Sequence, residues 1–186
     1  MDVGTAKTIY TIGHSTRSIE EFIDILRHYG VDEVVDIRTM PRSRKNPQFN
    51  RDELECALPE AGISYTYAKD LGGLRKPRKD SLNAGWRNDS FRGFADYMQT
   101  PEFSDAIQRL MELTEHKTIA IMCAEVLPWR CHRSLIADAL VIRGYDVVEI
   151  FYKEKSRTHK LTPFAIAEGD KVTYPSVDLQ HNDSLD

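Results

Sequence analysis

The chain has 186 residues, of which 41% are hydrophobic and 29% charged, and its formal net charge at pH 7 is −4. This size and composition are typical of one globular domain, which we expect over residues 1–175, with a disordered polar tail over residues 176–186. No apolar stretch approaches the roughly 20 residues of a membrane helix and Met1 to Lys7 lack the apolar core of a signal peptide, so we expect a cytoplasmic protein without a membrane partner.

In the first half of the chain, short apolar runs alternate with segments in which apolar residues recur at helical spacing. Apolar residues recur at helical spacing after Ser18, which forms a capping box with Glu21, and Gly30 ends this helix. A basic loop over residues 40–49 contains two prolines, which argue against regular structure. The other predicted elements are strands at residues 8–12, 31–39 and 63–67 and a short helix at residues 51–60.

The second half begins with a long irregular segment, residues 71–88, in which paired glycines precede a basic cluster. Loops of this length in compact domains are usually functional or disordered. The elements predicted after it are helices at residues 91–97, 103–113 and 133–144, strands at residues 118–122 and 146–151, and a docking segment that ends in a small hairpin, residues 161–174.

Five short apolar strands that alternate with helices predict a single α/β domain with a mainly parallel, doubly wound sheet. The expected fold is Rossmann-like or flavodoxin-like, with the hairpin at its C-terminus. The order of the strands is left open between these two arrangements.

Polar and reactive residues lie at the C-terminal ends of the predicted strands and in the segments that follow them. Because parallel strands point their carboxyl ends to one edge, these residues should converge on a common pocket, which is the usual ligand position of such sheets. The predicted set comprises Gly13, His14, Ser15, Thr16, Asp36, Arg38, Arg42, Gly72, Gly73, Cys123, Glu125, Cys131, His132 and Arg133.

Positive charge is concentrated in the middle third of the chain. Between Arg38 and Arg92 there are 12 Lys and Arg against 7 Asp and Glu, although the whole chain is acidic. This distribution indicates either an ordinary solvated surface or an electrostatic funnel for an anion. A small anionic or nucleotide-like ligand fits better than a long nucleic acid, which usually requires a more basic domain.

Three cysteines are too few for a disulfide framework, so free thiols are expected at Cys56, Cys123 and Cys131. Cys123 follows an apolar strand and is equally well explained as a small buried hydrophobe. Cys131 lies near the first turn of a helix beside basic residues, where a thiolate is favoured. Glu125 is either a general acid or base or a solvated carboxylate.

Two kinds of site are compared for this segment. A metal site would use Cys123, Cys131, His132 and His14, but their spacing matches no familiar zinc pattern. The segment is closer to the phosphate-cradling loops of cysteine-dependent phosphatases and sulfurtransferases. The match is partial, because the spacing from Cys123 to Arg130 is one residue too long and Pro128 removes one N–H group.

Several ordered motifs resemble a mostly bacterial, uncharacterised family, the domain of unknown function 488. The resemblance covers nearly the whole chain, with a departure at residues 126–130, where similar sequences usually carry a more charged loop. It implies a site at these motifs without implying a reaction. The matching segments are residues 11–15, 36–38, 41–43, 71–73, 123–125, 131–133 and 159–165, together with Phe22 and Phe49.

Two functional hypotheses follow, and neither names a cofactor. The first is an enzyme for a phosphate-bearing substrate, a nucleotide or nucleic-acid end. In it Arg38, Arg42 and Arg133 neutralise the anion, His14 or His132 moves a proton, and Cys131 or Cys123 is the nucleophile or positions the substrate. The second is a non-catalytic module for a nucleotide or single-stranded nucleic acid, with stacking faces at Trp86, Trp129, Tyr67 and Phe49.

Overall fold

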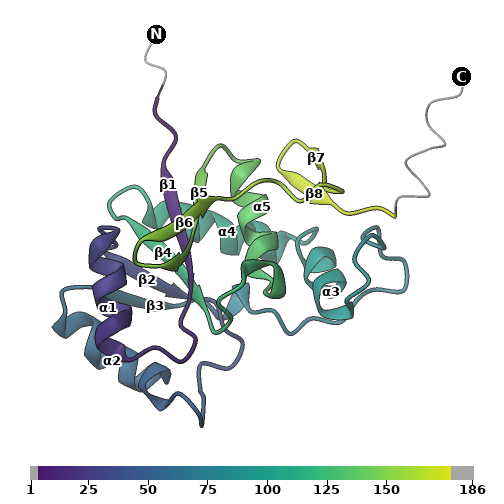
Figure 1. The fold of residues 1–186 in the computed structure, drawn as a ribbon. Helices are drawn as coiled ribbons and strands as arrows, with labels where there is room; N and C mark the ends of the chain where they lie inside the picture. The colour runs from purple at the N-terminus through teal and green to yellow at the C-terminus, as the bar shows by residue number, and fades with distance from the viewer. Residues whose placement is uncertain (1–3, 177–186) are drawn as a thin grey trace, which may run out of the picture.

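The computed structural model describes residues 4–176, and a mostly parallel β-sheet with helices on both faces lies at its centre (Figure 1). The strands are β1 (Thr8–Gly13), β2 (Glu33–Asp36), β3 (Ser64–Tyr67), β4 (Ile119–Cys123), β5 (Asp146–Tyr152), β6 (Lys155–Thr158), β7 (Ile166–Glu168) and β8 (Lys171–Thr173). The α-helices are α1 (Ile19–His28), α2 (Arg51–Glu60), α3 (Asp89–Tyr97), α4 (Pro101–Leu113) and α5 (Arg133–Val141). Short 3-10 helices span η1 (Pro47–Phe49), η2 (Lys69–Leu71) and η3 (Pro128–Arg130).

The main sheet has six strands in the order β3-β2-β4-β1-β5-β6, and β7 and β8 form a separate antiparallel hairpin. The predicted α/β class, the mainly parallel, Rossmann-like fold with helices on both faces and the C-terminal hairpin are confirmed. Two details differ from the prediction. The strand order matches neither arrangement left open by the sequence, and an additional strand, β6, pairs antiparallel with β5. Its residues are polar and exposed, so it carries no apolar alternation that would predict a strand.

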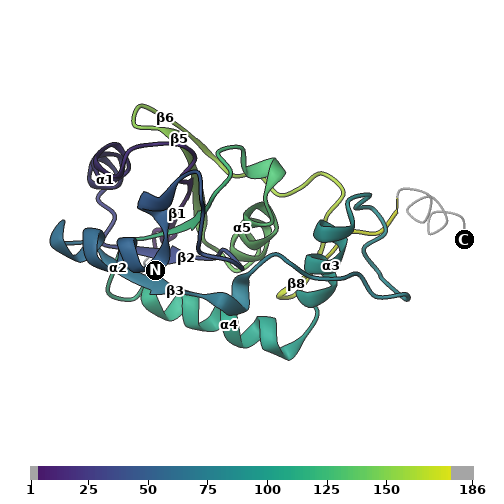
Figure 2. The same ribbon diagram turned by 90° about the horizontal axis from the view of Figure 1, so that it is seen from below.

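The sheet separates two hydrophobic cores. Helices α1 and α2 pack on one face, and α3, α4 and α5 pack on the other (Figure 1). This division follows from right-handed crossover connections, because the chain moves in one direction across the sheet through α1 and α2 and in the other direction through α4 and α5. Beyond α5, α3 and β8 lie beside each other (Figure 2), and the Gln99 side chain donates a hydrogen bond to the Val172 carbonyl (2.7 Å).

Local sequence explains where the first helix begins and ends. The Ser18 hydroxyl accepts a hydrogen bond from the Glu21 amide (3.1 Å), which caps the N-terminus as predicted. The buried residues of α1 are spaced to lie on one face, at Phe22, Ile25 and Leu26. Gly30 follows the helix with a φ of 67°, a conformation that glycine adopts without a steric cost.

A buried polar cluster ties the C-terminal segment to the main domain. His159 bridges Asp138 of α5 and Glu149 of β5, with both N···O distances at 2.7 Å. Asp138 also accepts hydrogen bonds from the hydroxyl groups of Thr162 and Tyr174 (both 2.7 Å). Hydrogen bonding to the two carboxylates outweighs the effect of burial and raises the pKa of His159 to about 9, so the cluster holds a protonated imidazole at neutral pH.

The carboxyl ends of the parallel strands form a crevice at the centre of the sheet. Strand β4 lies between β1 and β2 and leads to α5 on one face, whereas β1 and β2 lead to α1 and α2 on the other. A ligand-binding crevice is expected where neighbouring connections diverge in this way. The loops after β1, β2 and β4 therefore enclose the candidate site.

Among the described residues, no helix is both long enough and apolar enough to cross a membrane. The predicted tail, apart from Ser176, lies outside these residues.

Candidate functional site

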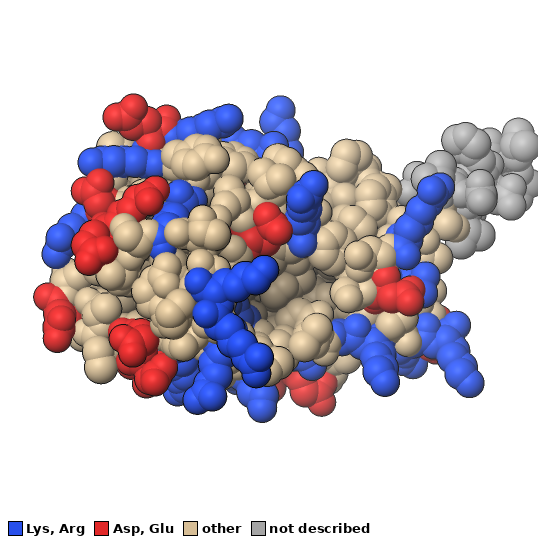
Figure 3. All heavy atoms as spheres, turned by 60° about the horizontal axis from the view of Figure 1, so that its bottom comes forward, with Lys and Arg blue, Asp and Glu red and all other residues tan. Residues whose placement is uncertain are grey.

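A cavity of about 350 Å³ opens at the carboxyl edge of the sheet. Its walls come from the loops after β1, β2 and β4, as the topology requires. On the face that comes forward from the bottom of Figure 1, Lys and Arg side chains gather beside a hollow (Figure 3). The lining residues include six of the predicted set, His14, Ser15, Thr16, Arg38, Arg42 and Glu125, together with Met40, Ser43, Asn46, Ala124 and Val126.

Arg38 is the most firmly held cation in this cavity. Its Nε and Nη2 donate to the two carboxylate oxygens of Asp36 (2.9 and 2.7 Å), and Nη2 also donates to the Phe49 carbonyl (2.7 Å). Burial lowers the pKa of Arg38, but hydrogen bonding to Asp36 raises it by more, so the guanidinium stays charged. Tyr65 fixes the same carboxylate by donating to it (2.6 Å).

His14 provides the third partner of the Arg38 guanidinium, with its Nε2 lying 3.3 Å from Nη1. The other ring nitrogen, Nδ1, lies 2.8 Å from the Ser15 carbonyl, to which it donates, so Nε2 is the acceptor. Burial lowers the pKa of His14 to about 4, and the ring stacks on Phe49 at a centroid distance of 4.4 Å. Neutral His14 therefore orients Arg38 and leaves one N–H of Nη1 without a partner among the described residues.

The turn after β1 is strained and closely packed. Ser15 is the only non-glycine residue with a positive φ (51°) in the described part of the chain, and such outliers concentrate at functional sites. A Cβ on Gly13 would lie 1.9 Å from the Glu125 carbonyl oxygen. The amides of His14 and Ser15 donate to the carbonyls of Cys123 and Ala124 (2.9 and 3.0 Å). Glycine at position 13 thus allows the loops after β1 and β4 to touch.

A second cluster contains the two buried cysteines and Arg133 at the start of α5. Arg133 is only 1% exposed, and no carboxylate within residues 4–176 lies at ion-pair distance from it. Its Nη1 donates to the sulfur of Cys123 (3.2 Å), its Nη2 donates to the Val126 carbonyl (2.6 Å), and its Nε has no partner in the described part of the chain. A buried charge requires a counter-charge, and the Cys123 sulfur is the group positioned to supply it.

The two thiols share one proton-binding equilibrium. Burial raises the pKa of Cys123, but hydrogen bonding with Cys131 and the charge of Arg133 lower it by more, to about 7. Hydrogen bonding to Cys123, together with burial, raises the pKa of Cys131 well above its usual value. The pair therefore loses its first proton from Cys123, while Cys131 keeps its own. The sequence favoured Cys131 as the activated thiol, whereas the Arg133 contact favours Cys123.

His132 lies next to Cys131 and packs against the paired glycines. His132 donates from Nε2 to the Leu71 carbonyl (2.8 Å), and its Nδ1 lies 3.6 Å from the Cys131 sulfur. Burial lowers the pKa of His132 to about 4, so the ring is neutral. A Cβ on Gly73 would lie 2.5 Å from that Nδ1, and one on Gly72 would lie 2.6 Å from Thr39 Oγ1. Both glycines permit close packing and neither lines the cavity.

The structure thus divides the predicted residues between the two faces of the sheet. Cys123 belongs to the core beneath α3, α4 and α5. His14 stacks on Phe49, which belongs to the core beneath α1 and α2. His14 and Arg38 line the cavity, but Cys123 does not, and the Ala124–Val126 segment lies between them. In place of the single shared pocket expected from the sequence, the structure has a cavity lined by His14 and Arg38 and an adjacent thiol cluster.

This division also bears on the metal alternative. The four predicted ligands do not come together, and the described residues contain no group of three or more His, Cys, Asp or Glu side chains arranged to hold a metal ion.

Sequence reasoning missed several residues of the site. Ser43 and Asn46 line the cavity, and Tyr65 buttresses Asp36. Period-two spacing places Tyr65 on the same face of β3 as Tyr67, but this pattern does not predict that Tyr65 bonds to Asp36. Among the proposed stacking residues, Phe49 is fully buried, whereas Trp129 is 52% exposed.

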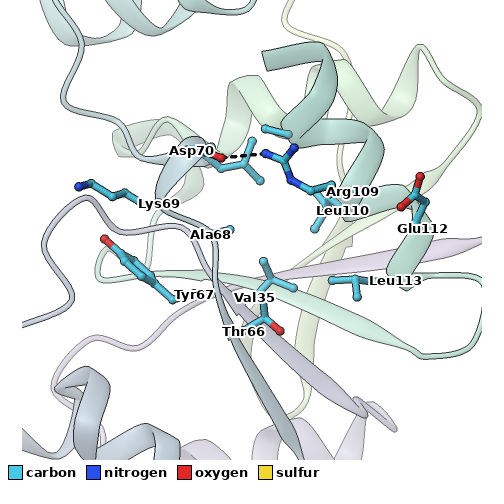
Figure 4. Close-up of a pocket in the computed structure, with 12 residues that line it drawn as sticks. Val35, Thr66, Tyr67, Ala68, Lys69, Asp70, Arg109, Leu110, Glu112 and Leu113 are labelled. Carbon is cyan, nitrogen blue, oxygen red and sulfur yellow. Dashed lines mark hydrogen bonds and ion pairs between the residues drawn. The ribbon is translucent and has the colours of Figure 1, made fainter. Parts of the chain in front are cut away.

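Another cavity, of about 520 Å³, lies between β3 and α4 (Figure 4). Its floor is apolar, with Val35, Leu110 and Leu113, and its rim carries the Asp70–Arg109 ion pair (2.8 Å). Its lining includes Tyr67, one of the proposed stacking residues, and none of the predicted catalytic or substrate-binding residues.

Comparison with protein families gives one match. Residues 18–140 match the family described as domain of unknown function DUF488, so the chain belongs to that family. No curated protein and no solved structure matches the chain. The matched range includes both the cavity and the thiol cluster, except for the turn after β1.

Proposed function

We propose that this DUF488-family protein is an enzyme that binds the phosphate of a nucleotide or nucleic-acid end in the cavity and uses Cys123 as its reactive group. The observation that carries the proposal is Arg38, whose guanidinium is held by Asp36, Phe49 and His14 while one N–H remains available at the cavity. A fixed donor of this kind needs no reorganisation when an anion binds.

Arg42 supplies the second positive charge. It lines the cavity and makes no ion pair within the described residues, whereas the charge of Arg38 is balanced by Asp36. Arginine suits phosphate because its planar N–H groups match two oxygens of the anion. The hydroxyl groups of Ser15 and Thr16, on the opposite wall, are further donors.

The reactive group is assigned to Cys123 because its thiolate is paired with Arg133 behind the Ala124–Val126 wall. A thiolate near neutral pH is a strong nucleophile. Glu125, which lines the cavity, is the carboxylate placed to exchange a proton with a bound ligand.

A second candidate function is a binding module without catalysis. The observation that favours it is that the Cys123 sulfur does not line the cavity, so anion binding does not require the thiol. The exposed ring of Trp129 is the stacking face that remains for this alternative.

Binding is tested by thermal shift and calorimetry with inorganic phosphate, nucleoside monophosphates and a 5′-phosphorylated single strand. We expect Arg42→Ala to weaken binding about tenfold, the effect of losing one charge-assisted hydrogen bond. Arg44→Ala is the matched control, because Arg44 is an exposed neighbour in the same loop that does not line the cavity. Absence of binding by all three ligands, or equal losses in both variants, would refute the proposal.

Catalysis is tested by following the same nucleotides with phosphorus NMR. Turnover that is lost in Cys123→Ser while binding is retained would establish the enzyme. Binding without turnover in the wild type would instead establish the module.

A further inference from the structure

We propose that Cys123 and Cys131 are a redox-active pair, in which a small hydroperoxide oxidises Cys123 and Cys131 then closes an internal disulfide. Phosphate chemistry requires only one thiol, so the second buried cysteine is left without a role in the proposed function. The inference does not depend on the phosphate ligand.

The first step depends on the contact between Cys123 and Arg133. The guanidinium Nη1 lies 3.2 Å from the sulfur and favours its negative form. Thiolates attack peroxides, whereas thiols do so poorly. In this step the sulfur takes one oxygen of hydrogen peroxide, the O–O bond breaks, and Cys123 becomes a sulfenic acid. The departing hydroxide takes a proton from solvent and leaves as water.

The second step depends on the position of Cys131. Its sulfur accepts a hydrogen bond from the Arg133 backbone N–H (3.5 Å), so the two sulfurs lie against different atoms of one residue. Both cysteines also belong to the same buried core, beneath α3, α4 and α5. The Cys131 sulfur attacks the sulfur of the sulfenic acid, the S–S bond forms, and the S–O bond breaks. The hydroxyl group leaves as water with the proton of Cys131.

The surroundings favour a disulfide within one chain. Cys123 is 3% exposed and Cys131 is 8% exposed, so neither sulfur is presented to a cysteine of a second copy. His132 Nδ1, which lacks a proton, lies 3.6 Å from the Cys131 sulfur and is placed to accept the proton of that thiol as it attacks. Cys56, by contrast, is exposed.

The chain offers a direct readout of the disulfide. Trypsin cleaves after Lys117, Arg130 and Arg133, which places the two cysteines in separate peptides, residues 118–130 and residues 131–133. A disulfide joins these peptides, and reduction with dithiothreitol separates them. Mass spectrometry distinguishes the joined form from each peptide alone.

The experiment treats the Cys56→Ser protein with hydrogen peroxide. We expect the protein to lose the mass of two hydrogen atoms and to yield the joined peptide. Cys131→Ser in the same background should instead gain one or more oxygen atoms on Cys123, and Cys123→Ser should gain none at Cys131. Circular dichroism confirms that each variant is folded.

Three results would overturn the inference. They are retention of both thiols in the peroxide-treated protein, oxygen gain on Cys123 without the joined peptide, and disulfides that only join two copies of the chain. None of these readouts uses a phosphate ligand, so failure here is distinguishable from failure of the proposed function.

Discussion

Replacing Arg133 with methionine should raise the pKa of Cys123 by about one to two pH units, the usual effect of losing an opposite charge in contact. Burial by itself raises the pKa of this thiol, whereas hydrogen bonding with Cys131 and the charge of Arg133 bring it from the usual 9.0 to about 7. Without that charge the effects of burial and of Cys131 remain, so we expect the pKa of Cys123 to move from about 7 toward its usual value. Each unit corresponds to about 1.4 kcal/mol.

The sign of the accompanying stability change follows from the direction of the shift. A thiol whose pKa is lower in the folded protein stabilises the fold above its unfolded pKa, and this stabilisation is lost as the pH falls through about 7. In Arg133→Met we expect that pH dependence to weaken. Methionine fills much of the buried volume without introducing an unpaired polar group.

The assay is the ultraviolet absorbance of the thiolate as a function of pH, measured in the Cys56→Ser background. Arg130→Met is the matched control, because Arg130 is exposed and makes no ion pair in the described structure. Its Cys123 midpoint should stay near 7. A wild-type midpoint at or above 9, or an unchanged midpoint in a folded Arg133→Met protein, would refute the pairing of thiolate and guanidinium.

Three further predictions concern stability. The pKa of His159 is raised from 6.5 to about 9. Its contribution to folding stability, about 3 kcal/mol, is therefore complete below pH 6.5 and is lost as the pH rises through 9. Urea denaturation at about pH 6 and about pH 10 should show this loss in the wild type and not in His159→Gln. Ser15→Gly should raise the thermal midpoint, because it relieves about 1 kcal/mol of left-handed backbone strain at a φ of 51°, and a lowered midpoint would contradict this account. Gly73→Ala places a methyl group 2.5 Å from His132 Nδ1 and should cost about 1–3 kcal/mol in chemical denaturation, whereas Gly4→Ala, with nothing within 4 Å, should be neutral.

Sequence patterns predicted the architecture because strands and helices leave periodic traces. The apolar run after Lys117 and the helical spacing after Ser18 correspond to β4 and α1. Convergence at the carboxyl edge followed from the parallel sheet, and six predicted residues line the same cavity. The sequence could therefore predict that the loops after β1, β2 and β4 meet at the carboxyl edge of the sheet.

Which of the predicted residues lie on each face of the sheet could not be predicted, because the strand order was unknown. A side chain's face depends on strand register as well as on which helices cover each side. Cys123 is the last residue of β4 and His14 follows the last residue of β1, yet Cys123 lies in the core beneath α5 and His14 stacks on Phe49. The Arg133–Cys123 contact was also beyond the sequence, because ten residues and a 3-10 helix separate the partners. Sequence reasoning therefore assigned activation to Cys131, the nearer neighbour of the basic cluster.

Arg133 connects the thiol cluster with the cavity at the carboxyl edge of the sheet. One guanidinium nitrogen donates to the Cys123 sulfur, and the other donates to the carbonyl of Val126, a residue that lines the cavity. In the proposed redox reaction, oxidation of the thiol pair removes the negative charge that balances Arg133, and a buried cation without a counter-charge is costly. The guanidinium would then depend more on its contact with the Val126 carbonyl. We therefore expect the redox state of the cysteines to influence the position of Val126 at the cavity.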